Sequence, residues 1–385
     1  MTYAKWAMLA VVALALLASA CAGSQRSASP TVSQTPEQQA VRQAPIIGIN
    51  FAGGPLPLID LLAGVVVGNV DSGYTPEVLL RRKSGQLLVS QAFGPGPAQA
   101  DESSLAIFDL DDLSSPSAII PMPGRPSFTG YARSAVLSRD EHYLYYPQAT
   151  SICPEGGDGA VCTEWSIGVI DLQAERQVAQ AEIGLVGCIP KIHVEPEAEQ
   201  TVLVTCGSVA RTSVEFTPDA VTFLRIGPNG AASELGTFPG RRTANWIKSV
   251  LFAGQRADGT YFAVYNDGAV FDAGGDEAII DLLPEEDWEF GFNTGAMLGS
   301  DRYLLAFGAR FNPAILGVVV LNAAAPEDVR TFDLPFAFQH VAPLDERRVA
   351  LLHGDGLEVS VLDVETGSVS NAMTLPERVG WLSGG

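Results

Sequence analysis

Positive charge is scarce in this chain of 385 residues, because 23 Lys and Arg stand against 44 Asp and Glu and give a formal net charge of −21. Binding to nucleic acid depends on clustered Lys and Arg that neutralise phosphates. The densest basic cluster, Arg81-Arg82-Lys83, directly follows Leu80 and is typical of a solvated strand edge. The composition therefore argues against nucleic acid as a partner.

Short catalytic motifs are also missing. The sequence has no G-x-S-x-G elbow, no H-E-x-x-H pair, no Walker loop and no C-x-x-C. Gly94-Pro95-Gly96 is followed by another proline rather than by a helix, so it is not a phosphate-binding loop. We therefore predict no catalytic residue and no cofactor, and we favour a non-enzymatic role over an enzyme.

Long apolar runs are confined to the N-terminus. Lys5 precedes an apolar run from Trp6 to Ala20, which is shorter than the roughly 20 apolar residues that a spanning helix needs. A charged start, a short apolar core and small residues at its end indicate a secretory signal peptide over residues 1–20. Because no second apolar run follows, we expect nothing downstream to cross a membrane.

The signal ends in Leu17-Ala18-Ser19-Ala20-Cys21, which resembles the lipobox of bacterial lipoproteins. The resemblance implies that Cys21 becomes the N-terminus and carries a diacylglycerol thioether, whose acyl chains anchor the protein stably. The alternative is an ordinary secreted protein cut at the same bond, since Ala18-Ser19-Ala20 is also a simple cleavage site. Five cysteines favour lipidation, because a lipid on Cys21 leaves an even number for disulfides.

An exported, lipid-anchored protein is the resulting expectation, held on the cell membrane or the outer membrane with its folded part outside the cytoplasm. Residues 21–45 are rich in Ser, Gln, Thr and Pro and have too few large apolar residues to fold, so they predict a disordered linker after the lipid. Residues 46–385 form the predicted folded domain.

The remaining cysteines predict disulfides, which export permits. They are Cys153, Cys162, Cys188 and Cys206. Four cysteines allow three pairings, between which the sequence does not choose, although nearness along the chain favours Cys153–Cys162 and Cys188–Cys206. A zinc site is the alternative, but the short paired spacing of zinc ribbons is absent.

Short β-rich runs separated by Gly, Pro, Asp and Asn dominate the folded domain, and helical patterns are nearly absent. A recurring unit consists of an apolar strand that ends in an acidic or amide residue, followed by a turn. Its copies lie at 106–110, 168–172, 318–322 and 359–364, with weaker ones at 221–226 and 268–272. A period of about 40–50 residues with about four strands is typical of a β-propeller. We predict an all-β protein with seven blades of four-stranded antiparallel sheet, the strands between residues 64 and 92 completing the seventh; two β-sandwiches are the alternative.

Parts of the folded domain resemble the heavy chain of methylamine and aralkylamine dehydrogenases and its YVTN-like propeller superfamily. They are segments 167–172, 187–188 and 202–207 and the last repeat, from His340 to Thr374. The resemblance implies a seven-bladed propeller and a Cys188–Cys206 disulfide. In those enzymes the heavy chain carries no catalytic residue, and a separate light chain holds the quinone. A non-catalytic propeller subunit of such a redox enzyme is therefore the alternative function.

Three patterns have a metal-binding interpretation beside a structural one. Strand alternation places His193 and Glu195 on one face, and the acidic turns 109–112 and 272–277 offer oxygen ligands for Ca²⁺. A solvated strand face and turns whose acidic residues bind their own backbone explain these patterns better, so we predict no metal site. Of the four histidines, His340 and His353 come from the last repeat, where one could approach a central channel. The function that we favour is a binding or scaffold module for a protein or small molecule.

Overall fold

Strands are the regular elements of the part of the chain described by the computed structural model. It describes residues 46–49, 55–61, 63–71, 79–91, 104–122, 125–126, 135–151, 164–186, 188–195, 198–209, 220–243, 246–248, 250–283, 288–290, 296–298, 302–309, 314–322, 324–379 and 381–384. These ranges belong to one compact unit, Glu37–Gly385, and within them no helix is long and apolar enough to span a bilayer. The predicted all-β class is confirmed. The predicted signal peptide, Cys21, the predicted linker, Cys153 and Cys162 lie outside the described residues.

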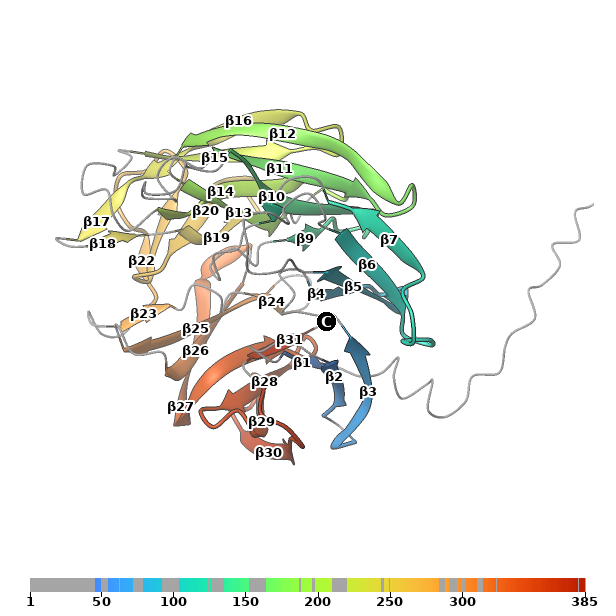
Figure 1. Ribbon diagram of the computed structural model, residues 1–385. Helices are drawn as coiled ribbons and strands as arrows, with labels where there is room; N and C mark the ends of the chain where they lie inside the picture. Colours follow the sequence, from blue (N-terminus) through green and yellow to red (C-terminus); the bar gives the residue numbers. More distant parts are fainter. Residues whose placement is uncertain are drawn as a thin grey trace, which may run out of the picture. The chain divides into compact units, whose positions relative to one another are not determined.

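The strands form antiparallel sheets, mostly of four strands, that follow one another in chain order (Figure 1). Sheet A contains β31 (Trp381–Gly384), β1 (Ile46–Ile49), β2 (Pro55–Asp60) and β3 (Val65–Asp71). Sheet B contains β4 (Leu79–Arg81), β5 (Gln86–Gln91), β6 (Ser104–Asp109) and β7 (Ala118–Pro121). Sheet C contains β8 (Arg125–Pro126), β9 (Val136–Leu137), β10 (Tyr143–Ser151), β11 (Glu164–Asp171) and β12 (Arg176–Val186). Sheet D contains β13 (Cys188–Val194), β14 (Val202–Val209), β15 (Ala220–Ile226) and β16 (Ala232–Pro239).

A short ribbon and two further sheets complete the order. The ribbon pairs β17 (Arg241–Thr243) with β18 (Trp246–Lys248). Sheet F contains β19 (Val250–Gln255), β20 (Tyr261–Tyr265), β21 (Ala269–Asp272) and β22 (Ile280–Asp281). Sheet G contains β23 (Trp288–Phe290), β24 (Ala296–Leu298), β25 (Arg302–Ala309), β26 (Ile315–Asn322), β27 (Ala325–Pro343), β28 (Arg348–His353), β29 (Glu358–Asp363) and β30 (Val369–Thr374).

Sheet G consists of two parts that share one strand, and in the first part β23 and β24 both pair with β25, where they take the place of the first strand. The first part of β27 pairs with β26, for example through Val320↔Arg330, and its last part pairs with β28, for example through Val341↔Leu351. We call the half with β25 and β26 G1 and the half with β28 to β30 G2. β27 is thus the fourth strand of G1 and the first strand of G2.

Among the described residues the apolar core is divided into seven clusters, each made by two successive sheets. The pairs are A–B, B–C, C–D, D–F, F–G1, G1–G2 and G2–A. β5 shows why both faces of a sheet are apolar, because Leu87 and Val89 pack toward sheet A while Leu88 packs toward sheet C. Since no sheet can bury both of its faces alone, the neighbouring sheets cover them.

Sheet A joins the two ends of the folded unit. β1 pairs antiparallel with β31, with Ile47 opposite Ser383 and Ile49 opposite Trp381. This pairing and the G2–A cluster close the series of sheets, so the fold is a β-propeller. The first strands of neighbouring sheets contact one another, as β31 does with β4 and with β27 and as β13 does with β9 and with β19. The predicted number of seven blades is compatible with the seven clusters and stays a prediction.

Every predicted copy of the strand–acid–turn unit is the third strand of a sheet, counted from the first strand. These strands are β6, β11, β15, β21, β26 and β29. In four of them the terminal side chain accepts the backbone N–H two residues on, as Asp109 Oδ1 does from Asp111 at 3.0 Å, Asp171 Oδ1 from Gln173 at 2.9 Å and Asn322 Oδ1 from Ala324 at 2.9 Å. Asp363 Oδ1 accepts in the same way from Glu365 at 2.9 Å. The acid therefore fixes the turn that leads to the fourth strand.

Glycine stands opposite an aromatic residue in several sheets. Gly168 pairs with Tyr146 in sheet C and Gly317 pairs with Phe307 in sheet G, and a Cβ at either glycine would overlap the facing ring. Tyr146 and Phe307 are fully buried. The glycine therefore provides the space in which the ring lies across the strand and reaches the neighbouring sheet.

Replacing such a glycine is expected to destabilise the fold. Gly168→Val should lower the free energy of unfolding by about 1–3 kcal/mol or more, because the Tyr146 ring must leave its site in a packed core. Gly354→Ala is the matched control, since Gly354 is exposed and a Cβ there has no neighbour within 4 Å. Urea unfolding of both variants measures the difference, and equal stabilities would contradict this account of the cross-strand pair.

Candidate functional site

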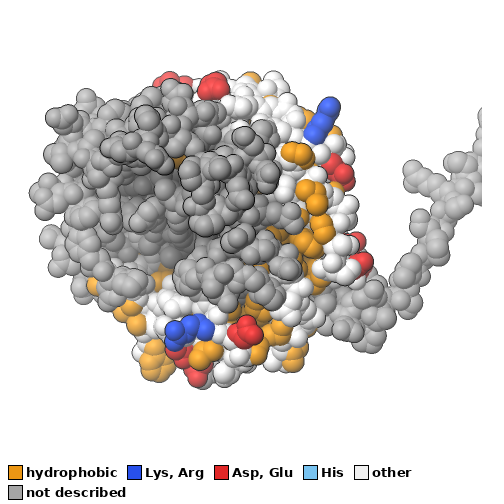
Figure 2. Space-filling view, in the orientation of Figure 1, with side chains coloured by type: hydrophobic (Ala, Val, Ile, Leu, Met, Phe, Trp, Pro, Cys, Tyr) orange, Lys and Arg blue, Asp and Glu red, His pale blue; other side chains and the backbone are white. Residues whose placement is uncertain are grey.

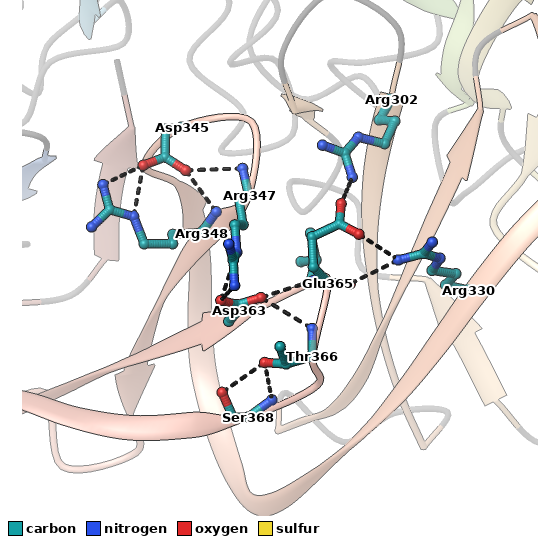
Figure 3. A network of polar contacts seen from close by, with 10 residues as sticks. Arg302, Arg330, Asp345, Arg347, Arg348, Asp363, Glu365, Thr366 and Ser368 are labelled. Carbon is teal, nitrogen blue, oxygen red and sulfur yellow. Dashed lines mark hydrogen bonds and ion pairs between the residues drawn. The ribbon is translucent and has the colours of Figure 1, made fainter.

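Several charged side chains of the described residues form ion pairs at the turns. On the face shown in Figure 2, the basic side chains lie in small groups beside acidic ones. The largest network joins G1 to G2 (Figure 3): Glu365, in the turn after β29, receives Arg302 Nη1 at 2.6 Å and Arg330 Nη1 at 2.9 Å. In the same network Arg347 Nη2 lies 2.6 Å from Asp363 Oδ2. These side chains are half-buried or exposed, and their arrangement is structural.

Asp363 makes this network sensitive to acid. The hydrogen bond from Arg347, supported by the backbone N–H groups of Thr366 and Glu365, lowers the pKa of Asp363 to about 2. A carboxyl group with a lowered pKa stabilises the fold above its unfolded pKa of about 3.9 and loses that contribution as the pH falls. Asp363→Asn should therefore lower the melting temperature at pH 6, and its difference from the parent should shrink between pH 4 and pH 2. Asp333→Asn, on an exposed position of β27, is the control and should show no such convergence.

The acidic turns and three of the four histidines have structural roles. In the turn 109–112, Asp109 Oδ1 accepts the N–H of Asp111 at 3.0 Å, and in the other acidic turn Asp272 Oδ1 lies 3.0 Å from Arg256 Nε. His142 lies 3.2 Å from Asp171, and His353 Nε2 lies 2.8 Å from the Ser360 hydroxyl. His340 Nδ1 accepts the N–H of Leu382 at 3.3 Å and so joins the first strands of sheets G2 and A. The described residues contain no group of three or more His, Cys, Asp or Glu side chains arranged for a metal ion.

The fourth histidine belongs to a polar row on the first strand of sheet D. Lys191, His193 and Glu195 alternate with Ile192 and Val194, so they share the face that the sequence predicted for His193 and Glu195. Ile192 packs in the C–D cluster, whereas the His193 ring lies edge-on to Phe252 of sheet F at 5.9 Å between centroids. The row therefore faces the junction of sheets D and F.

Glu195 is engaged by a cation from its own sheet. Its side chain is fully buried, and its carboxylate receives Arg225 Nε at 2.8 Å together with the Arg225 Nη2 group and the Thr201 hydroxyl. Arg225 also donates to the Tyr261 hydroxyl of sheet F at 2.7 Å. His193 and Glu195 are not arranged as a pair of metal ligands, because the Glu195 carboxylate is bonded to Arg225.

Lys191 and His193 make the most unusual ionisable pair among the described residues. His193 is 4% exposed, and its Nε2 lies 3.1 Å from the hydroxyl of the fully buried Thr205, the residue that pairs with Lys191 in the sheet. Burial lowers the pKa of Lys191 to about 8. Burial, aided by the charge of Lys191, holds the pKa of His193 well below its usual value, so its imidazole is neutral. An amine and a neutral imidazole on one face can bind a ligand and move a proton.

In sheets B, C and D the connections between strands differ in length at the two ends of the strands. At one end short turns join the strands, as at 82–85 in sheet B and at 172–175 in sheet C. At the other end the second and third strands are joined by the longer connections 92–103, 152–163 and 210–219. Thr205, opposite Lys191, is followed on β14 by the third of these connections. Lys191 is the fourth of the seven residues of β13 and so lies midway between the two ends of the strand.

Cys188 and Cys206 lie on neighbouring strands, β13 and β14, and in the register of this pair Cys206 stands opposite Pro190. The disulfide predicted between them stays a prediction. Sequence reasoning did not single out Lys191 as a site residue. The signal that could have found it is its position two residues before His193, which a strand with period two places on the same face.

Known structures similar to this chain support the fold. No protein-family model and no curated protein sequence matches it. The β-propeller domain of Cps50 (Swd1) from Myceliophteria thermophila is 13% identical, with 80% of this chain and 90% of that chain covered and a TM-score of 0.51. A protein from Lactobacillus plantarum is also 13% identical, with 88% and 97% covered and a TM-score of 0.51. At this identity the likeness shows the β-propeller fold alone.

Proposed function

We propose that this protein is an exported lipoprotein, anchored through Cys21, whose β-propeller binds a protein or small-molecule ligand outside the cytoplasm. The observation that carries the binding role is the polar group Lys191, His193 and Thr205 on the first strand of sheet D. First strands lie around the axis of a propeller, where the fold offers a channel to ligands. Polar groups whose pKa values are displaced by burial mark candidate binding sites.

The frame around this polar group supports the proposal. Successive sheets share apolar clusters, so the strands that carry Lys191 and Thr205 are held from both sides. A rigid scaffold with longer connections at one edge is the usual arrangement of binding proteins, because loops vary while the scaffold fixes their positions. The fold supports a binding role in general, and the chemistry of the site is what indicates the kind of ligand.

A thermal-shift screen tests the binding role on the detergent-solubilised full-length protein. A ligand present at 100 times its dissociation constant should stabilise the protein by about 2.7 kcal/mol and raise its melting temperature measurably. The shift should be lost in Lys191→Met and kept in Lys83→Met, whose parent residue is an exposed lysine. If a broad metabolite panel and a pull-down from solubilised membranes both give nothing specific, the binding proposal is wrong.

The anchor has its own test. Cells grown with an alkyne-bearing fatty acid should label the parent protein and fail to label Cys21→Ser, and the variant should leave the membrane fraction. Ala22→Ser is the matched control and should behave as the parent does. A Cys21→Ser protein that stays lipid-labelled and membrane-bound would overturn the anchor while leaving the binding role open to its separate screen.

A second candidate is the propeller subunit of an amine dehydrogenase-like redox enzyme. The observation that favours it is the placement of Cys188 and Cys206 on adjacent strands, as the resemblance to the heavy chain implies. In that case the purified protein should recover a small, cysteine-rich, quinone-bearing chain from the same cells, and the complex should reduce a dye with amine substrates. Recovery of no such chain and no dye reduction would exclude this candidate.

A further inference from the structure

Phe336 on β27 is an aromatic side chain that the fold leaves in water. Among the described residues it is the most exposed of the large apolar side chains, at 65%, and its neighbours Pro335 and Ala337 are exposed as well. A run of exposed apolar residues is unfavourable on the surface of a protein unless it has a binding role. The segment 335–337 is therefore a candidate for contact with a partner.

The backbone of β27 produces this exposure through irregular pairing. Asp333 stands opposite Gly317 and Phe338 stands opposite Ile315, so the four residues 334–337 of β27 face a single residue of β26. Extra residues of this kind bend a strand and re-aim its side chains, and they are frequent next to functional sites. Phe338, where the pairing with β28 begins, is buried, so the apolar exposure ends there.

A carboxylate lies close to the exposed ring. The ring of His353, at the end of β28, lies 6.5 Å from the Phe336 ring between centroids, and its Nδ1 lies 3.8 Å from Glu358 Oε2. His353 is held in place by the buried Phe338, whose ring stands edge-on at 4.8 Å, and by the Ser360 hydroxyl at 2.8 Å from its Nε2. The Glu358 side chain is 49% exposed. An aromatic face and a carboxylate thus flank one fixed imidazole, and both reach solvent.

The charges around this surface favour a cationic partner. The turn that joins β28 to β29 contributes the exposed Asp355, whose carboxylate accepts the N–H of Leu357 at 2.9 Å. Arg378, the base beside this turn, is engaged through its Nε, which donates to the carbonyl oxygen of Asp355 at 2.7 Å. The whole chain carries a formal net charge of −21. A basic partner is therefore attracted as it approaches, and an acidic one is repelled.

We propose that Phe336 and Glu358 form a docking site for an arginine side chain in a basic segment of a partner protein. The guanidinium group of arginine is planar, stacks on aromatic rings and donates paired hydrogen bonds to carboxylates. It therefore uses both groups at once, whereas an aliphatic side chain uses only the ring. The site lies on a different sheet from the polar group of sheet D, so it adds a protein partner to the proposed ligand site.

Fluorescence anisotropy tests the docking site on the detergent-solubilised full-length protein. The probe is a fluorescein-labelled peptide of alternating Arg and Ser, and the same peptide with Glu in place of Arg is its control. We expect the Arg peptide to bind and the Glu peptide not to bind. Phe336→Ala should weaken binding by about tenfold or more, as the loss of an aromatic anchor does at protein interfaces. Glu358→Gln should also weaken it and should reduce its dependence on salt.

Matched variants separate the site from the overall negative charge. Ile119→Ala removes a side chain that is 56% exposed on β7, and Glu234→Gln removes an exposed carboxylate of β16, so both should bind the Arg peptide as the parent does. Circular dichroism confirms that each variant is folded.

Failure of the Arg peptide to bind, or an effect of Phe336→Ala or Glu358→Gln no larger than that of its control, overturns the proposal. A dimer in analytical ultracentrifugation that Phe336→Ala dissociates would assign the surface to a second copy of this chain and would overturn it as well. The thermal-shift screen reports on sheet D, so its result is independent of these outcomes.

Discussion

Deleting residues 381–385 is expected to abolish the cooperative folded state at 37 °C. The deletion removes β31, which is the only described partner of β1 on that side and which closes sheet A. It also removes Leu382, 2% exposed, from the G2–A cluster and uncovers Leu352 and Val359. The loss of a strand ladder and a core side chain together approaches the 5–15 kcal/mol that a domain has in total.

Point variants give the truncation a graded control. Leu382→Ala keeps the strand and should cost about 2–5 kcal/mol through the cavity that it leaves. Thr374→Ala, on the exposed edge strand β30, should change stability by less than about 0.5 kcal/mol. Urea unfolding followed by circular dichroism measures all three proteins. A truncated chain that unfolds at the same urea concentration as the parent would show that the pairing of β1 with β31 does not hold the fold together.

Arg225→Ala is expected to be more damaging than Glu195→Ala, although each variant removes one partner of the same ion pair. Glu195 is fully buried, so loss of Arg225 leaves a buried carboxylate without its cation, at a cost of about 3–5 kcal/mol. The Arg225 side chain is 38% exposed and also contacts Tyr261, so it can turn to water when Glu195 is lost. Glu195→Ala should therefore lower the free energy of unfolding clearly less than Arg225→Ala does.

The double variant Glu195→Met with Arg225→Met completes the cycle. Replacing both charges by apolar side chains of similar length leaves no unpaired charge, so its stability should lie above that of Arg225→Ala. Urea unfolding of the parent, of Glu195→Met and Arg225→Met as single variants and of the double variant gives the coupling energy. A larger loss for Glu195→Ala than for Arg225→Ala would contradict the burial argument.

Much of the fold follows from local patterns that the sequence displays. The strand–acid–turn copies were found because an apolar run buried on both faces must end in a turn, and the Asp or Asn side chain fixes that turn by accepting a backbone N–H two residues on. The prediction for the 64–92 region was wrong in its grouping: β3 ends sheet A at Asp71, and β4 begins sheet B at Leu79. The copy that was missed is β2, where Asp60 Oδ1 accepts the N–H of Ala63 at 3.0 Å.

Contacts between distant segments account for what the sequence did not predict. The pairing of β1 with β31 joins opposite ends of the chain, and no local pattern reports it. For the polar row, period two correctly placed His193 and Glu195 on one face, but the partner of Glu195 comes from β15. The neutral state of His193 and the lowered pKa of Lys191 depend on burial, which only the packing of the sheets reveals.

The long strand β27 gives two neighbouring sheets a common backbone. Because side chains alternate along a strand, a slip of one residue against β26 would turn the side chains in the first part of β27 to the opposite face. The register of β27 shifts between Asp333 and Phe338 and again between Phe338 and His340, before the part that pairs with β28. The two sheets are therefore joined through one continuous backbone, while each keeps its own pairing register.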